Sequence, residues 1–522
     1  MSGLEMLKTA AVYAGSLTFC TLLLIAGYRI LLHPLHSYPG PLLAKLTAWY
    51  AGSHAIKRNL HLELVKNHTK YGSVVRLAPN RLVFNTVTAF RGIYQNEHVI
   101  KSYTYASTSK DFRVNLLTDR DPKSHSARRR LIGQALTERT MRSFAPNMLE
   151  LVNGYLELIL ASPDAVNMTE RTRLLAVDIV GRLAFGYDLG MQKRPDNHFI
   201  PKAMGLSHYR FNIYHHLYFL SQIEPTKLFN YLQQENRGKY WRLLQTMIKT
   251  RMAQDRHAQA DLFSFIADEM DAQPDTLNGG MMWTEAAFFM AAGGDTVATL
   301  MSAAFFYLSR NPECYKQLAH EIRSTFPSGR DIEAGPQLAG CTYLRACINE
   351  SLRMSPPSGS VHWREQDPKD TQPLVVDGHV IPRGTLVAVS PYALQHNEAY
   401  YPDPYTFRPD RWLNVPGNEE ACKTAHDALG AFSTGSRSCA GKALAYLESS
   451  LVLAKTIFYF DFEPVAGELG KVGEGTPGAR DGRDKIGEFQ IYDIFTARHD
   501  GPYLTFRPRG DLCMKDLEAS KK

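Results

Sequence analysis

The stretch of sequence that decides the fold reads Phe432-Ser-Thr-Gly435-Ser-Arg437-Ser-Cys439-Ala-Gly441, and an apolar run with helical spacing follows it. A cysteine on a glycine-rich loop at a helix N-terminus is stabilised as a thiolate by the helix dipole and by free backbone N–H groups. A thiolate is a soft, strongly donating ligand for iron. We therefore predict that Cys439 binds a metal through its sulfur.

The neighbours of Cys439 suit a flat ligand. Gly435 lets the loop turn tightly, and Gly441 lets the following helix lie close to a planar macrocycle. Phe432 could shield the sulfur from water, and Arg437 could pair with a carboxylate of the ligand.

Composition excludes several classes of protein. The chain has 522 residues, of which 44% are hydrophobic and 21% are charged, as in a globular protein with a large core. The net charge of +7 is small for this length, so a nucleic-acid partner is not expected. The seven cysteines are widely spaced without a C-x-x-C pair, which argues against a disulfide framework.

The N-terminal segment predicts a membrane anchor. Thr9 to Tyr28 is a run without charge, long enough for a helix of roughly 30 Å. A cleaved signal peptide is the alternative, but its apolar region is shorter, about 7–15 residues. Basic residues after the run place the rest of the chain on the cytosolic side. We expect a short tail at 1–8, a transmembrane helix at 9–32, a proline-rich hinge at 33–45 and a catalytic domain at 46–522.

The remainder predicts a mainly α fold with small β-sheets. Helical patterns dominate from about residue 100 to residue 460, and β-like stretches lie near Ser73–Phe84, Leu374–Val389 and Tyr503–Phe506. Because no repeat and no clear linker divides the chain after Lys45, we expect one large domain.

One predicted helix, from Trp283 to Leu308, carries only two charges, Glu285 and Asp295. Such a helix is either a membrane span or the centre of a large fold. Two glycines and a carboxylate within Ala292–Thr296 would be costly in lipid, so we predict a buried central helix. Each glycine costs about 1 kcal/mol relative to alanine, and close approach of a flat ligand would offset this cost.

The segment Phe432–Gly441 resembles the haem-binding signature F-x-x-G-x-R-x-C-x-G of cytochrome P450 monooxygenases. Three further motifs follow in the family's order, and the resemblance covers nearly everything from Pro34 to Arg509. It implies a single large cytochrome P450 fold, haem b as the cofactor and Cys439 as the axial ligand of its iron. The implied activity is insertion of one oxygen atom from O2 into an apolar organic substrate.

The first further motif, Ala292–Thr296, is similar to the family's A-G-x-D/E-T. The resemblance implies that Gly293 faces the haem and that Asp295 and Thr296 deliver protons during oxygen activation. Splitting the O–O bond requires protons in a pocket that excludes bulk water. The alternative for Thr296 is a structural hydroxyl that bonds to the carbonyl four residues earlier.

The second motif, Glu350-Ser-Leu-Arg353, is similar to the family's E-x-x-R, and Phe407-Arg-Pro-Asp-Arg411-Trp is similar to its later F-x-P-x-R-W. By this resemblance Arg411 joins the Glu350–Arg353 pair in a buried network that supports the cysteine loop.

The third motif, His125-x-x-x-Arg129, is similar to a W/H-x-x-x-R element whose residues contact the haem propionates. A cation paired with a desolvated carboxylate suits that role. Arg364, at the start of a strand-like stretch, is a further propionate candidate. A solvated basic face is the alternative for Arg129, because Arg128 and Arg130 flank it.

Electrons must come from another protein, since no strand–GxGxxG–helix nucleotide site is evident. The resemblance implies NADPH–cytochrome P450 reductase as the membrane-bound partner, with cytochrome b5 as a second donor, and a location in the endoplasmic reticulum membrane. A basic face that includes Lys442 could steer the reductase.

By analogy the substrate pocket draws on four segments rich in Phe, Tyr and Leu, which suit a hydrophobic small molecule. They are Tyr103–Leu117, Ala203–Leu220, Phe288–Ala292 and Ser358–Val361. The layout resembles microsomal fungal members, which often tailor secondary metabolites.

Three other functions are considered. An isomerase or dehydratase of the same fold would need no external electrons, but it would have no use for Asp295 and Thr296 as a proton relay. A non-enzymatic membrane haem protein acting as a sensor would need an output domain, for which no residues are left. An α/β hydrolase would use Ser433, but its alternating strands and helices and its acid–base pair are not evident.

Overall fold

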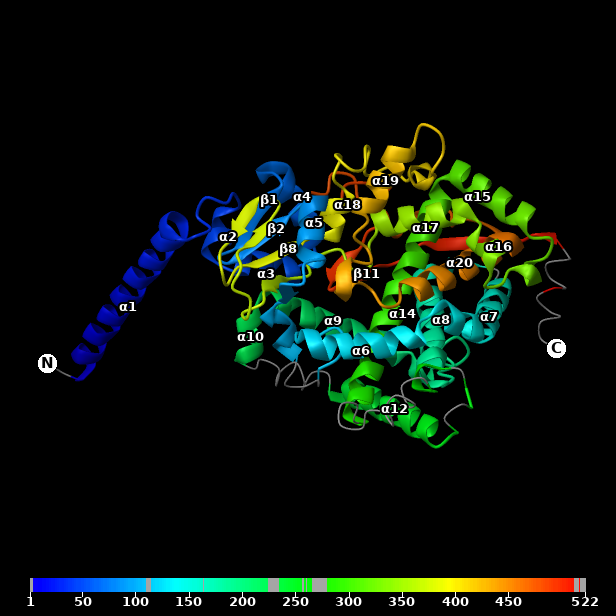
Figure 1. Ribbon diagram of the computed structural model, residues 1–522, viewed down its shortest axis with the longest axis horizontal. Helices are drawn as coiled ribbons and strands as arrows, with labels where there is room; N and C mark the ends of the chain where they lie inside the picture. Colours follow the sequence, from blue (N-terminus) through cyan, green and yellow to red (C-terminus); the bar gives the residue numbers. More distant parts are fainter. Residues whose placement is uncertain are drawn as a thin grey trace.

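The computed structural model describes residues 3–108, 114–162, 164–223, 234–255, 258–259, 261–264, 279–510 and 516. Helices make up most of this part of the chain, and four small sheets accompany them (Figure 1). The prediction of a mainly α fold with small β-sheets is confirmed.

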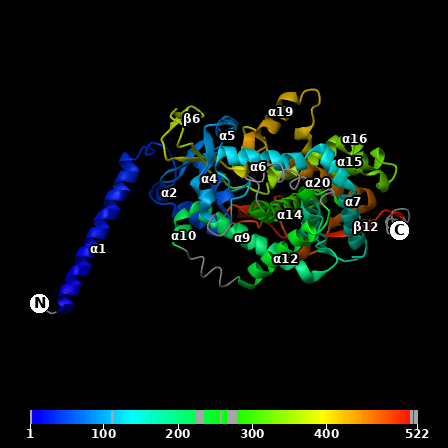
Figure 2. The same cartoon turned by 60° about the horizontal axis from the view of Figure 1, so that its bottom comes forward.

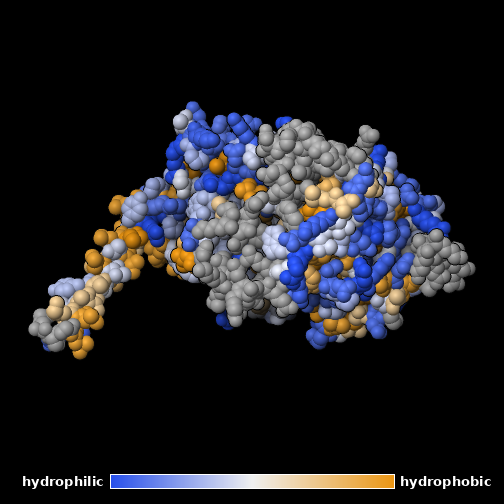
Figure 3. Space-filling view, turned by 90° about the horizontal axis from the view of Figure 1, so that it is seen from below, coloured by the Kyte–Doolittle hydropathy of each residue, from blue (hydrophilic) through white to orange (hydrophobic). Residues whose placement is uncertain are grey.

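The N-terminal helix stands apart from the rest of the molecule and exposes an apolar surface (Figures 1 and 3). Helix α1 spans Gly3–Gly27 and continues as one π-helical turn, Tyr28–Leu32. It begins before Thr9, where the sequence predicted its start. The apolar span Leu4–Leu32 is long enough to cross a membrane and is 0% buried, so it suggests a membrane anchor.

The proline-rich segment after α1 is attached to the domain by Arg76. This fully buried guanidinium donates hydrogen bonds to the carbonyl oxygens of Arg29 (2.9 Å) and Leu35 (3.2 Å). Helix α2, Leu42–Leu46, begins directly after Pro41, so the last part of the predicted hinge is helical.

A five-stranded sheet lies at the end of the domain near the anchor (Figure 1). Its strands, in spatial order, are β1 (Val74–Ala78), β2 (Arg81–Phe84), β8 (Leu386–Val389), β5 (Arg364–Gln366) and β3 (Val99–Lys101). Strands β2 and β8 are parallel, and the other neighbouring pairs are antiparallel. Lys101 of β3 lies opposite Arg364 of β5, so the sheet places two cations side by side.

Four short helices accompany this sheet: α3 (Trp49–Ile56), α4 (Leu60–Tyr71), α5 (Val87–Tyr94) and α18 (Pro391–Gln395). The larger helical body contains α6 (Pro122–Ala135), α7 (Glu138–Leu160), α8 (Met168–Phe185), α9 (Phe199–His216), α10 (Tyr218–Gln222), α12 (Gln234–Met252), α14 (Gly279–Arg310), α15 (Pro312–Thr325), α16 (Pro336–Ala339), α17 (Thr342–Met354), α19 (Glu419–Ala428) and α20 (Lys442–Tyr459). Side chains mark several helix starts; Asp121 and Asn167 accept backbone N–H groups at the N-termini of α6 and α8.

Three smaller sheets complete the fold. They are the three-stranded β4 (Val166–Asn167), β12 (Tyr503–Pro508) and β9 (Phe460–Pro464), and the hairpins of β6 (Leu374–Val376) with β7 (His379–Ile381) and β10 (Tyr492–Ile494) with β11 (Thr496–Arg498). The three predicted β-like stretches are confirmed. Strands β3, β4, β10 and β11 were missed because two or three residues are too few to show a period, and the five-residue β9 was missed as well.

Helix α14 runs through the middle of the helical body (Figures 1 and 2). The apolar span Ala287–Arg310 is 67% buried, and Phe305 is fully buried, so the prediction of a buried central helix is confirmed. This helix is the scaffold from which the candidate site is built.

The glycines of α14 allow this helix to pack closely on α8. A Cβ added to Gly293 would lie 2.5 Å from Cγ2 of Val180, and one added to Gly294 would lie 2.9 Å from Cγ2 of Val177. Both valines belong to α8. Close packing of α14 on α8 therefore helps to offset the cost of these glycines.

Candidate active site

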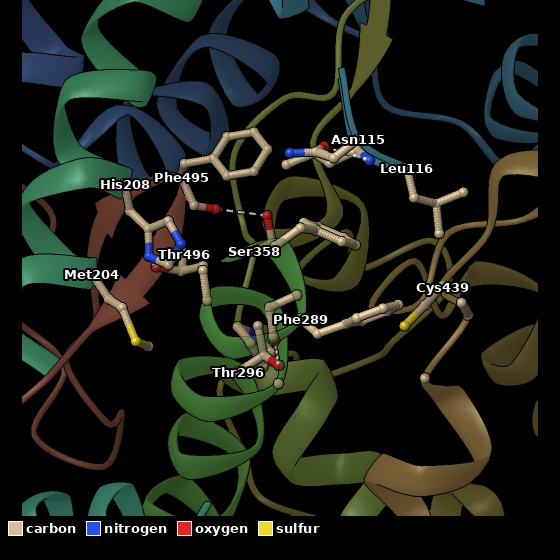
Figure 4. A pocket seen from close by; sticks show the side chains of 18 of the residues that line it. Asn115, Leu116, Met204, His208, Phe289, Thr296, Ser358, Cys439, Phe495 and Thr496 are labelled. Atoms are coloured by element: carbon tan, nitrogen blue, oxygen red, sulfur yellow. Dashed lines mark hydrogen bonds between the residues drawn. The ribbon is translucent and has the colours of Figure 1, made fainter. Parts of the chain in front are cut away.

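A cavity of about 470 Å³ is lined by the cysteine loop, α9, α14 and the ends of β3 and β5. Cys439 lies on one side of it, and His208, Met204 and Thr496 lie on the other (Figure 4). Of the residues singled out from the sequence, those that line the cavity are His125, Arg129, Gly293, Thr296, Arg364, Phe432, Arg437, Cys439 and Gly441. Those outside its lining are Asp295, Glu350, Arg353, Arg411 and Gly435.

The cysteine loop is held by its own backbone. The Cys439 N–H donates to the carbonyl oxygen of Phe432 at 2.8 Å, which closes the loop. Gly435 has a φ of +75°, and an added Cβ would lie 2.1 Å from the carbonyl oxygen of Tyr94. Only glycine fits such a position. An added Cβ at Gly441 would meet nothing within 4 Å, which leaves open space beside the start of α20.

The Cys439 thiol is exposed to the cavity, although the protein surrounds it. Burial raises its pKa, while the backbone N–H of Gly441 and the charges of Arg129 and Lys442 act in the opposite direction. A metal cation would add a further favourable charge for the thiolate. The surroundings of the sulfur thus suit a metal ligand.

Five basic side chains line the cavity beside the cysteine loop: Lys101, His125, Arg129, Arg364 and Arg437. None of the described residues in the lining is Asp or Glu. Burial lowers the pKa of Lys101 far below its usual value, that of Arg437 to about 10 and that of His125 to about 3. Such a desolvated basic cluster is costly unless an anion joins it.

This basic cluster fits the two carboxylates of a haem. Its members are held by neutral oxygens: Lys101 Nζ donates to the carbonyl oxygen of Leu116 at 2.8 Å, and Arg437 Nη1 to that of Asp119 at 2.7 Å. The thiol, the basic cluster and the open space beside Gly441 together match what a thiolate-ligated haem requires.

Lys101 was missed by the sequence analysis. Its signal is a single lysine in the buried strand β3, where a charge is costly without a partner. Arg129 was singled out with an alternative, a solvated basic face. Its Nη1 donates to the carbonyl oxygen of Ser438 at 2.6 Å, so this side chain contacts the cysteine loop instead.

Glu350, Arg353 and Arg411 form a buried ion network. Arg353 donates to both carboxylate oxygens of Glu350, at 2.8 and 2.9 Å, and Arg411 Nε approaches Oε1 at 3.3 Å. Trp412 Nε1 and the Arg408 N–H add two hydrogen bonds, each of 3.0 Å. Burial raises the pKa of Glu350, but its arginine partners and hydrogen bonds outweigh burial and lower it overall. The carboxylate is therefore ionised and fully paired.

Gln395 connects this network to the cysteine loop. Its side-chain amide donates to the carbonyl oxygens of Leu352 (3.0 Å) and Arg353 (2.9 Å), and its Oε1 accepts from the Gly430 N–H at 2.9 Å. Gly430 precedes Phe432 by two positions. No short motif marks Gln395, so its role could not be predicted from the sequence.

Thr296 and Asp295 point in different directions from α14. The Thr296 hydroxyl lines the cavity and donates to the carbonyl oxygen of Ala292 at 2.6 Å, which is the structural bond considered above. Asp295 is 6% exposed, and its oxygens lie 3.3 Å from His208 Nδ1 and 3.4 Å from Arg173 Nε. Only one member of the predicted pair therefore faces the cavity.

The rest of the lining is largely apolar. All four predicted pocket segments contribute, through residues such as Leu117, Phe211, Phe289 and Ser358. Residues 109–113 of the first segment lie outside the described residues. Helices α8 and α12 and the turn at Phe495 also contribute, and these were missed because no local pattern marks them.

Residues 39–473, most of the chain, match the family described as Cytochrome P450. The fold, the cysteine loop and this match define the class: the chain belongs to the cytochrome P450 family and is a cytochrome P450 monooxygenase.

Similar proteins include three fungal enzymes. Cytochrome P450 monooxygenase AKT7 of Alternaria alternata is 34% identical over 92% of this chain and 94% of its own length. Cytochrome P450 monooxygenase apf7 of Gibberella fujikuroi is 33% identical over 94% of this chain and 97% of its own length. Cytochrome P450 monooxygenase poxM of Penicillium oxalicum is 34% identical over 92% of this chain and 91% of its own length.

Proposed function

We propose that this monooxygenase binds haem b through Cys439 and oxidises an apolar intermediate of fungal secondary metabolism. The observation that carries the proposal is one cavity that joins a thiol, a basic cluster without acidic neighbours in the described lining, and a largely apolar chamber. The fungal relatives, aligned over nearly their whole length, support the assignment to fungal metabolism.

The residues beside Cys439 would hold the cofactor. When bound, a thiolate-ligated haem supplies the activation of O2, with electrons from a partner protein. The Cys439 sulfur would ligate the iron, and the basic cluster would bind the propionates and so fix the plane of the macrocycle. The Glu350 network, acting through Gln395, would keep the loop in place.

Thr296 and Asp295 of α14 would deliver protons during the reaction. Thr296 lines the cavity, so its hydroxyl would hold a proton donor near the reacting oxygen. Asp295, whose carboxylate meets Arg173 and the cavity-lining His208, would supply protons. The apolar walls would exclude bulk water and limit competing proton delivery.

The proposal includes a membrane location and protein partners that donate electrons. The exposed apolar helix α1 would anchor the protein in the endoplasmic reticulum membrane as a single span, with the catalytic domain in the cytosol. NADPH–cytochrome P450 reductase would deliver electrons, and cytochrome b5 would serve as a second donor. Lys442, next to the cysteine loop at the start of α20, would help to attract the acidic partner.

Isotope labelling tests the reaction. The holoprotein, reconstituted with reductase in vesicles, is supplied with NADPH, 18O2 and a panel of long-chain and polycyclic hydrocarbons. We expect products that carry one 18O atom and that require NADPH. Unlabelled product formed without NADPH would instead support an isomerase or dehydratase.

The proton relay has its own test. Thr296→Ala should retain the haem spectrum but divert NADPH electrons to peroxide. Unchanged coupling of NADPH consumption to product in this variant would show that Thr296 is not part of the relay.

A further inference from the structure

The cavity has a polar corner on the side away from Cys439. His208 of α9 and Thr496 of β11 meet there, as Figure 4 shows, and both line the cavity. Asp295 of α14 lies behind them, with its Oδ2 3.3 Å from His208 Nδ1. Three elements from distant parts of the sequence thus converge on one imidazole ring.

The contacts of His208 occupy one of its two ring nitrogens. Nδ1 lies 3.0 Å from the Thr496 hydroxyl as well as 3.3 Å from the Asp295 carboxylate. In the neutral imidazole only one nitrogen carries a proton, and the position of Nδ1 beside two oxygen atoms favours the tautomer with the proton on Nδ1. The second nitrogen, Nε2, then has a lone pair, and it makes no hydrogen bond to the described part of the chain.

The apolar surroundings of His208 favour ligands that can donate a hydrogen bond to its Nε2 atom. Apolar side chains form most of the chamber wall, including Met204, Phe289 and Phe495. In such surroundings a polar group of a ligand loses its water, and it binds well only where the protein offers a matching partner. A few placed polar groups in an apolar pocket fix the orientation of a ligand.

We propose that His208 is the residue that orients the substrate, by accepting a hydrogen bond from a hydroxyl or N–H group at one end of an otherwise apolar molecule. The opposite end of the substrate then extends toward Cys439 (Figure 4). Asp295 and Thr496 position the ring. This inference rests on the proposed function and names the substrate class: an elongated apolar compound with a hydrogen-bond donor remote from the carbon that is oxidised.

Binding of matched probes tests the assignment without requiring turnover. Equilibrium dialysis measures the affinities of 1-dodecanol and of its methyl ether, which lacks the donor, for the holoprotein. One hydrogen bond corresponds to a preference of about fivefold for the alcohol. His208→Phe should abolish this preference, whereas His208→Gln, which keeps an acceptor oxygen, should restore part of it.

Two controls separate the possible outcomes. Lys202→Gln, at an exposed position of α9 outside the cavity lining, should keep the wild-type ratio. Each variant must show the carbonyl spectrum of a haem-thiolate protein; if the wild type lacks it, the proposed function fails. If the wild type has this spectrum but shows no preference, or if His208→Phe keeps the preference, the role of His208 is overturned while the proposed function stands.

Discussion

The two sides of the cavity are built by different means. On the side of Cys439, backbone hydrogen bonds and a buried ion network fix a single short loop. On the side of His208, the wall consists of mostly apolar side chains from α8, α9, α12, α14 and β11. In the proposed function the Cys439 side holds the cofactor and carries the chemistry. The His208 side is a packed surface whose side chains can change with little effect on the fold, and in the proposed function it determines which molecule is oxidised.

The largest loss of stability is expected from substitution of Glu350, whose ion network supports the Cys439 side of the cavity. Glu350→Gln would leave Arg353 and Arg411 buried without their carboxylate, which should cost about 3–5 kcal/mol of unfolding free energy and reduce haem retention. Denaturant unfolding and haem content measure both effects. The control Glu313→Gln removes an ion pair in which Glu313 is 83% exposed, and it should change little. Equal losses for the two variants would contradict a central role for the buried network.

A pH-dependent effect is expected at Glu448, on the helix that follows the cysteine loop. Both carboxyl oxygens are buried without a hydrogen-bond partner among the described residues, and burial raises the pKa to about 8. As the pH rises from 5 to 8, the unfolded chain loses this proton before the folded protein does. The wild type should therefore lose roughly 3 kcal/mol relative to Glu448→Gln over this range.

Unfolding free energies measured at several pH values would show this trend. The exposed Glu420→Gln serves as the control and should follow the wild type at every pH. Parallel profiles for wild type and Glu448→Gln would mean that the folded protein tolerates the charged carboxylate.

The addition of one methyl group at Gly435 should destabilise the cysteine loop. Gly435→Ala forces a Cβ against the Tyr94 carbonyl oxygen at positive φ, with an expected cost of about 1–3 kcal/mol. Gly478→Ala is a matched control, because Gly478 has a φ of +79° but open space around it. Thermal unfolding compares the two, and a smaller loss for Gly435→Ala than for Gly478→Ala would argue against the tight approach to Tyr94.

The smallest effect on stability is expected in the chamber. Phe289→Ala, at a partly buried position that lines the cavity, should cost about 1 kcal/mol or less but weaken the binding of 1-dodecanol. Phe305→Ala on the same helix removes a fully buried ring and should cost about 3–5 kcal/mol. If Phe289→Ala destabilises the fold as much as Phe305→Ala, the chamber wall is part of the core.

The same contrast explains what could be predicted from the sequence. Gly435, Arg437 and Cys439 are recognisable because the loop requires fixed residue types at fixed local spacing, and α14 was found from its length and apolar character. The positions of Lys101 and Gln395 depend on strand pairing and packing between distant segments, which no local pattern records. The packing of the α14 glycines against the valines of α8 was likewise hidden, since it joins segments distant in the sequence.

The most direct test of the account is the absorption spectrum of the reduced, carbonyl-bound holoprotein and of its Cys439→Ala variant. Thiolate ligation predicts a strongly red-shifted Soret band in the wild type, and this band should be absent from Cys439→Ala. A full-length protein that holds no porphyrin, or a Cys439→Ala variant that keeps the shifted band, would contradict the assignment of Cys439 as the iron ligand.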